Sequence, residues 1–104
     1  MSLWEERAAR NEALFREVNE QIERRHDGGV AHFVCECSRE ECTERLHLSL
    51  SVYDAIRSAP RRFLLVAGHE NEQVDTVVER GDGYVVVEKD GAAGRIADRT
   101  DPRG

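Results

Sequence analysis

The three cysteines of the chain fall within eight positions, in the stretch Cys35-Glu36-Cys37-Ser38-Arg39-Glu40-Glu41-Cys42. Three cysteines can form at most one disulfide, and Cys35 and Cys37 are too close in sequence for good disulfide geometry. The N-terminal sequence is polar and carries no secretory signal, which predicts a cytoplasmic location where clustered thiols are more often metal ligands than disulfides. We therefore expect the fold to be built over one metal site.

A histidine is expected to complete this site, because three thiolates and one imidazole form a full tetrahedral ligand set for zinc. His69 follows a glycine just after an apolar run, at a strand end where a ligand can be presented without disturbing the core. His32, three residues before the first cysteine, is the alternative ligand. Glu36, Glu40 or a water molecule are the remaining choices. Glu70 is expected to orient the ligating imidazole by accepting a hydrogen bond from it.

Zinc is the expected metal, and a [2Fe–2S] cluster is the alternative. Three cysteines and one histidine beginning with C-x-C partly resemble the CDGSH iron–sulfur proteins, which hold such a cluster. Here, however, the third cysteine follows too soon after the pair, and the Cys-Asp-Gly-Ser-His run is absent. Side chains two apart on a regular strand are about 7 Å apart, too far to share one ion. The chain is therefore expected to turn around Glu36.

The pattern of apolar residues predicts an α+β fold with a long N-terminal helix, a small and mostly antiparallel sheet, and a short second helix, stapled by the metal. We expect one metal-binding domain over residues 1–90. The helix would cover residues 1–25, and the sheet and metal site residues 32–90. Residues 91–104 are expected to form a flexible tail.

In the N-terminal helix, apolar residues recur at steps of three and four and predict a buried face. We expect Leu14, Phe15, Val18 and Ile22 to pack on the sheet, whereas Trp4 either packs there or pairs with a partner copy. Glutamates and arginines spaced four apart are expected to pair along the helix.

Two short strands, 32–35 and 45–50, flank the cysteines and predict a hairpin with the metal at its tip. The apolar run 63–66 predicts a central strand buried on both faces, which would deliver His69 to the same end. Valine-rich segments 73–80 and 84–89 around a glycine turn predict a second hairpin.

With these elements in place, nearly the whole chain before the tail resembles a family of small uncharacterised actinobacterial proteins. The resemblance lies in a set of short motifs: Arg-Asn-Glu with Phe-Arg-Glu-Val-Asn (10–12 and 15–19), Phe-x-Cys-x-Cys-x4-Cys (33–42), a tyrosine-containing helix, Pro-x-x-Phe, Gly-His-Glu (68–70), and a Val-Val-Glu-Arg hairpin ending in Val-Glu-Lys (77–89). Because Gly-His-Glu belongs to the pattern, the resemblance implies that His69 is the fourth ligand. It implies no reaction.

Net charge and the length of the apolar runs argue against some classes of function. A net charge of -6 and a pI near 5.2 argue against nucleic acid as the main partner, and no apolar run has the length of a membrane span. We expect a non-catalytic module that binds a protein partner or a second copy, or regulates one. A zinc-thiolate redox or metal sensor is the alternative. An enzyme is disfavoured because no H-E-x-x-H motif is present.

Overall fold

The computed structural model describes residues 3–39 and 41–103, with side chains from Arg7 onward. The elements in this part are α1 (Leu3–Arg24), β1 (Val30–Val34), β2 (Arg45–Ser49), α2 (Leu50–Ile56), β3 (Arg62–Val66), β4 (Asp75–Arg80), β5 (Tyr84–Lys89) and α3 (Gly91–Arg99).

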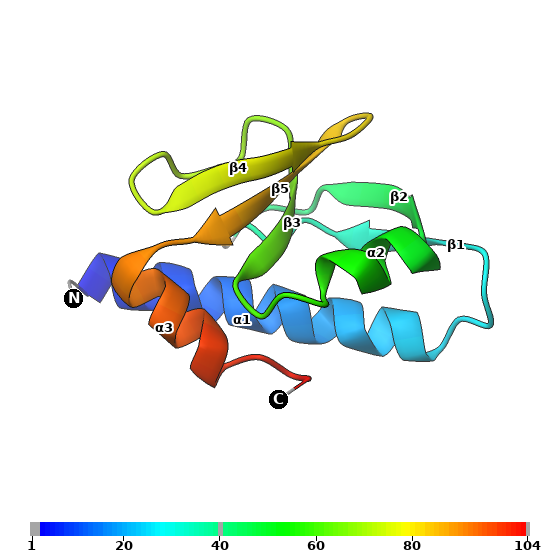
Figure 1. Cartoon of the computed structure of the whole chain (residues 1–104), viewed down its shortest axis with the longest axis horizontal. Coiled ribbons are helices and arrows are strands. Elements are labelled where there is room, and N and C mark those ends of the chain that lie inside the picture. The colour runs from blue at the N-terminus through cyan, green and yellow to red at the C-terminus, as the bar shows by residue number, and fades with distance from the viewer. Residues whose placement is uncertain (1–2, 40, 104) are drawn as a thin grey trace.

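The strands form two antiparallel sheets: a two-stranded sheet β1-β2 and a three-stranded sheet in the order β3-β5-β4. The long helix α1 runs beneath both sheets, α2 lies beside the smaller sheet, and α3 lies beside the N-terminal half of α1 (Figure 1). This arrangement confirms the expected α+β fold and both hairpins. The sheet is divided into two parts that the sequence did not distinguish.

Local sequence explains the start of α2 and the turn between β4 and β5. The Ser49 hydroxyl accepts a hydrogen bond from the backbone N–H of Val52 at 3.2 Å and so caps the first turn of α2. In the turn between β4 and β5, Gly83 has a φ of 81°. L-residues rarely adopt this conformation, so the turn requires glycine there.

Strand β3 holds the two halves of the core together. Leu64 belongs to a cluster with apolar residues of β1, β2 and α2, among them Phe33 and Tyr53. Phe63 and Leu65 belong to a second cluster, whose other buried members are Cys35, Cys37, Val85, Val87 and Ala97. The strand is therefore buried on both faces, as expected. Each such aromatic or aliphatic side chain contributes about 1.5–3 kcal/mol when fully buried.

β3 is nevertheless an edge strand, because β5 occupies the centre of its sheet. Its free edge is covered by the cysteine segment. The backbone N–H of Glu36 donates to Leu64 O at 2.8 Å, and Leu64 N–H donates to Glu36 Oε1 at 2.9 Å. Val66 N–H donates to Cys35 Sγ at 3.1 Å. These bonds satisfy groups that an edge strand otherwise leaves open, so the cysteine segment joins the two sheets.

The buried face of α1 differs from the one that apolar periodicity predicts. Leu14 is 58% exposed and Val18 is 37% exposed, while Phe15 is only partly buried. Ile22 does pack against the core, as expected. The side chain of Trp4 lies outside the described residues.

Polar residues occupy the buried face instead: Glu12, Arg16, Asn19 and Glu20. The Arg16 guanidinium lies 4.3 Å from the Phe63 ring centroid and donates to Pro60 O at 2.6 Å and to Ala97 O at 2.7 Å. Glu20 pairs with Arg57 at 3.1 Å rather than within the helix. A buried charge is tolerated when partners replace its water, and distant parts of the chain supply these partners.

The segment expected to be a flexible tail forms α3. Ala97 of this helix is buried in the core beside Phe63, and Arg103 beyond it pairs with Glu20 at 2.8 Å and with Glu23 at 2.7 Å. The segment is short and rich in small residues, so its sequence does not reveal these contacts. The partners of Arg103 lie 80 or more positions away in the chain.

Candidate metal centre

The three cysteines and His69, which the sequence singled out, converge at one place in the structure. Cys35, Cys37 and Cys42 lie on the loop between β1 and β2, and His69 follows β3. Because the cysteine segment is bonded along the edge of β3, the loop and the strand end reach the same place. The four ligand atoms all lie within 4.8 Å of one another.

The distances between these atoms suit a single tetrahedral ion. His69 Nδ1 lies 3.7 Å from Cys35 Sγ and 3.6 Å from Cys42 Sγ. With zinc–sulfur and zinc–nitrogen bonds of ordinary length, two ligand atoms of a tetrahedral site are about 3.5–3.8 Å apart. The geometry of these residues is therefore compatible with one tetrahedral metal ion.

The bend that brings the cysteines together lies at Cys37 and Ser38, one residue later than expected. Glu36, where the turn was expected, is hydrogen-bonded to β3 through Leu64 instead. A backbone hydrogen bond from Cys42 N–H to Arg39 O at 3.1 Å closes the return of the loop. Glu40, one of the alternative ligands, lies outside the described residues.

The thiols share protons unequally. A hydrogen bond from Cys35, together with one from His69, lowers the pKa of Cys37 despite its burial. The same Cys35–Cys37 bond and burial raise the pKa of Cys35, and burial raises the pKa of Cys42. The cluster thus favours a thiolate at Cys37, and a bound cation would stabilise the other two as well.

Glu36, also an alternative ligand, has a different role. Its side chain is fully buried, and burial raises its pKa. Glu36 Oε2 accepts hydrogen bonds from Tyr53 OH at 2.6 Å and Asn19 Nδ2 at 2.8 Å, while Oε1 accepts the bond from Leu64 N–H. The carboxylate therefore fixes the backbone between two cysteines to α1, α2 and β3.

Asn19 is a supporting residue that the sequence reasoning missed. Its Oδ1 accepts from Val34 N–H and its Nδ2 donates to Val34 O, both at 2.8 Å, so the side chain pairs with β1 as a strand would. Asn11 Nδ2 similarly donates to Cys37 O at 3.3 Å. The available signal was a polar stripe at helical spacing next to the apolar one.

His32 lies away from the cluster. It stacks on His47, its partner in the β1-β2 register, with ring centroids 4.4 Å apart, on the exposed face of the smaller sheet. Glu70 Oε1 accepts a hydrogen bond from Gly68 N–H at 2.7 Å and so holds the turn that presents His69. A Glu70–imidazole bond stays a prediction.

A polar cleft of about 600 Å³ borders the cluster on the side of His69, with Arg39 and Glu72 in its lining. Cys42 and His69 are half-buried, whereas Cys35 and Cys37 are buried. One edge of the site is therefore near solvent.

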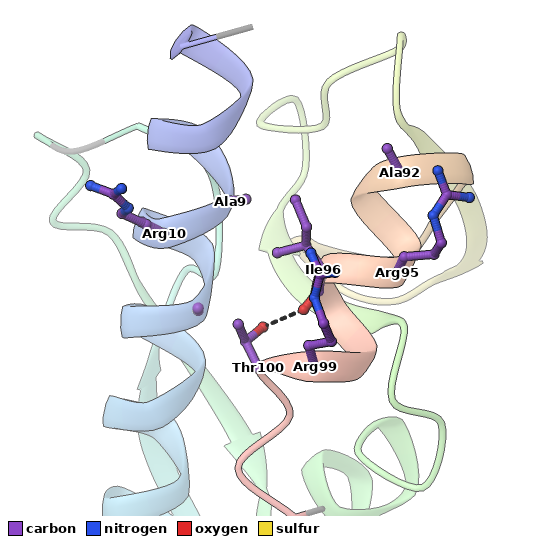
Figure 2. Close-up of a pocket in the computed structure, with 8 residues that line it drawn as sticks. Ala9, Arg10, Ala92, Arg95, Ile96, Arg99 and Thr100 are labelled. Carbon is purple, nitrogen blue, oxygen red and sulfur yellow. Dashed lines mark hydrogen bonds between the residues drawn. The ribbon is translucent and has the colours of Figure 1, made fainter. Parts of the chain in front are cut away.

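A separate groove of about 490 Å³ lies between α1 and α3. Ala9 of α1 faces Ile96 of α3 across it, and Thr100 Oγ1 donates to Ile96 O at 2.8 Å (Figure 2). The groove shares no residue with the Cys/His cluster. Among the described residues, no helix is both long and apolar enough to cross a membrane.

Compared with known proteins, the chain matches no family model, no curated protein and no solved structure.

Proposed function

We propose that the chain is a small zinc-binding protein whose structural site consists of Cys35, Cys37, Cys42 and His69, and that it serves as a non-catalytic protein-interaction or regulatory module. The observation that carries the proposal is the convergence of four ligand atoms within 4.8 Å of one another. Acidic residues alone cluster often without a metal, but three thiols and an imidazole are the ligand set of structural zinc sites.

The position of the cluster supports a structural role. The ligands come from both ends of the β1-β2 loop and from the end of β3, so one ion would tie the two sheets together. Cys35 and Cys37 also belong to the core around Phe63 and Leu65. A domain of this size gains from such a staple, because its core alone supplies limited stability.

The compactness of the cluster favours zinc over a [2Fe–2S] cluster. Two irons each carry two protein ligands, so ligands on different irons lie farther apart than ligands sharing one ion. The four ligand atoms here fit around a single centre. Zinc also suits a mixed thiolate and imidazole set without redox chemistry.

A closed ligand set supports a non-catalytic role, since catalytic zinc keeps a position for water or substrate. Cobalt substitution tests this point. We expect a tetrahedral Co²⁺ spectrum with thiolate charge-transfer bands that azide does not alter. A spectrum that azide changes would reveal an open position and overturn the closed site.

Metal analysis of protein purified without added metal tests the proposal as a whole. We expect one zinc per chain and, by X-ray absorption, three sulfur ligands and one nitrogen. Detection of iron together with inorganic sulfide would instead show that the site holds an iron–sulfur cluster. Three free thiols and no bound metal, even after zinc is supplied, would refute the site.

The second candidate is a zinc-thiolate sensor, favoured by the half-buried Cys42 and His69 at the edge of the cleft. Two thiolates would give two electrons to hydrogen peroxide, which takes up two protons from solvent. The products are one disulfide, two water molecules and the released zinc ion. Zinc release by stoichiometric peroxide that a dithiol reverses would support this function. Retention of zinc under those conditions would refute the sensor function and leave the structural role as the proposal.

A further inference from the structure

The chain contains a single lysine, Lys89, among 15 basic residues, so the other 14 are arginines. This lysine is not at the surface. Its side chain is 1% exposed, at the last residue of β5. An arginine is always charged, but a lysine can lose its proton and act as a nucleophile. The chain thus places its only side-chain amine in the interior.

Two carboxylates contact this amine directly. Lys89 Nζ pairs with Asp75 Oδ1 and with Glu12 Oε2, and the side chains of these acids are 1% and 8% exposed. Asp75 lies opposite Lys89 in the β4-β5 register, and Glu12 reaches the pair from α1. The Phe63 ring centroid lies 5.2 Å from Nζ. The group is a lysine, an aspartate and a second acid held together against an aromatic ring with little access to water.

We propose that Lys89 and Asp75 form an intramolecular isopeptide bond, with Glu12 as the acid–base residue that assists it. The bond joins Lys89 Nζ to Asp75 Cγ and covalently links β4 to β5.

The reaction balances without a further reactant. Lys89 passes one ammonium proton to Asp75, which leaves a neutral amine beside a carboxylic acid. The nitrogen lone pair attacks Asp75 Cγ while Glu12 accepts a proton from nitrogen and donates its own to an Asp75 oxygen. Collapse of the intermediate breaks one C–O bond and releases one water molecule. Glu12 ends in its starting protonation state, and nothing is oxidised or reduced.

The surroundings favour each step. Asn71 N–H donates to Asp75 Oδ2 at 2.8 Å and can stabilise the charge that develops on this oxygen during attack. Holding the amine against the acid replaces a bimolecular encounter by a positioned one, and exclusion of water favours its loss as product. Burial raises the pKa of Glu12 to about 7, against the lowering effect of Lys89, so its carboxyl can hold a proton near neutral pH.

A buried ion cluster without covalent chemistry is the competing explanation. Elsewhere in the chain, the cation that pairs with a buried carboxylate is an arginine, as in the pair of Arg57 with Glu20. With Glu12 protonated, the ion cluster still keeps one ammonium and one carboxylate out of water, which is costly. Amide formation removes both the ammonium and one carboxylate.

Mass spectrometry of the full-length protein tests the bond. We expect an intact mass lower by one water molecule. Dehydration at one of the Asp-Gly sequences would give the same mass but leave the lysine amine free. After denaturation, an amine reagent should therefore label no lysine. Trypsin should give peptide 63–80 joined to peptide 81–95, with no cleavage after Lys89, and fragmentation should place the link between Asp75 and Lys89.

Matched variants separate the chemistry from the fold. Lys89→Arg keeps the charge and should abolish the mass loss, and Glu12→Gln should abolish or strongly slow it. Asp75→Asn should change the loss from water to ammonia if its amide reacts. Asp98→Asn, which breaks the exposed pair with Arg61, should keep the full water loss. A wild-type protein with linear peptides and one reactive lysine amine per chain, fresh or aged, overturns the proposal, and a cross-link that persists in Glu12→Gln overturns the role of Glu12.

Discussion

Glu36→Gln gives the sharpest test of how the cysteine segment is held. Glu36 Oε2 accepts two hydrogen bonds and Oε1 accepts one, all from donors that are themselves buried. A glutamine keeps the shape but replaces one oxygen by an NH₂ group. If the remaining oxygen faces Tyr53 and Asn19, the NH₂ meets the Leu64 N–H, donor against donor.

The loss of stability expected for Glu36→Gln follows from these hydrogen bonds. A hydrogen bond to a charged group contributes about 1.5–3 kcal/mol, and a buried donor left without a partner costs about 1–3 kcal/mol. The two terms overlap because they concern the same N–H, so we expect a loss of about 2–4 kcal/mol in the free energy of unfolding. For a domain of this size that is a large fraction of the total.

Urea unfolding at neutral pH, with equal metal content in both proteins, measures the loss. The midpoint should fall while the slope m stays constant, because the surface exposed on unfolding is unchanged. Glu17→Gln, on the exposed side of α1, is the control and should change stability by less than about 0.5 kcal/mol. A loss at Glu36 no larger than at Glu17 would refute the three-donor arrangement.

Three further predictions concern other parts of the molecule. His69→Ala should lose stoichiometric zinc on dialysis against a weak chelator, whereas His32→Ala should retain it, as elemental analysis will show. Glu12 has a folded-state pKa of about 7, above its ordinary 4.5, so its stabilising contribution is complete below pH 4.5 and is lost as the pH rises through 7. In the Lys89→Arg background, where no cross-link can form, adding Glu12→Gln should therefore flatten the unfolding free energy between about pH 5 and 8, measured by urea titration. Arg16→Lys should cost about 1–3 kcal/mol in the same assay, because an ammonium cannot reach both Pro60 O and Ala97 O with the fork of a guanidinium.

The candidate site was largely readable from sequence because its ligands are chemically distinctive. Thiols are rare in this chain, so three within eight positions stand out without any knowledge of the fold. The choice of His69 over His32 depended on a strand end meeting the cysteine loop, and the structure brings these segments together. The residues that hold the site in place could not be predicted from the sequence. Asn19 and Tyr53 act through contacts with Glu36 across 17 positions each, and no local pattern announces them.

Local sequence by itself determined every element except α3. The long helix, the two hairpins and the cysteine loop follow from periodicity, turn glycines and capping, which act between near neighbours. Only the tertiary structure decided which face of α1 is inside. Periodicity places Leu14 and Val18 in the core, yet the helix buries Glu12 and Arg16 against Lys89 and the carbonyl groups near α3. A charged side chain can be buried only where partners from distant segments replace its water, and those partners are assembled by the fold.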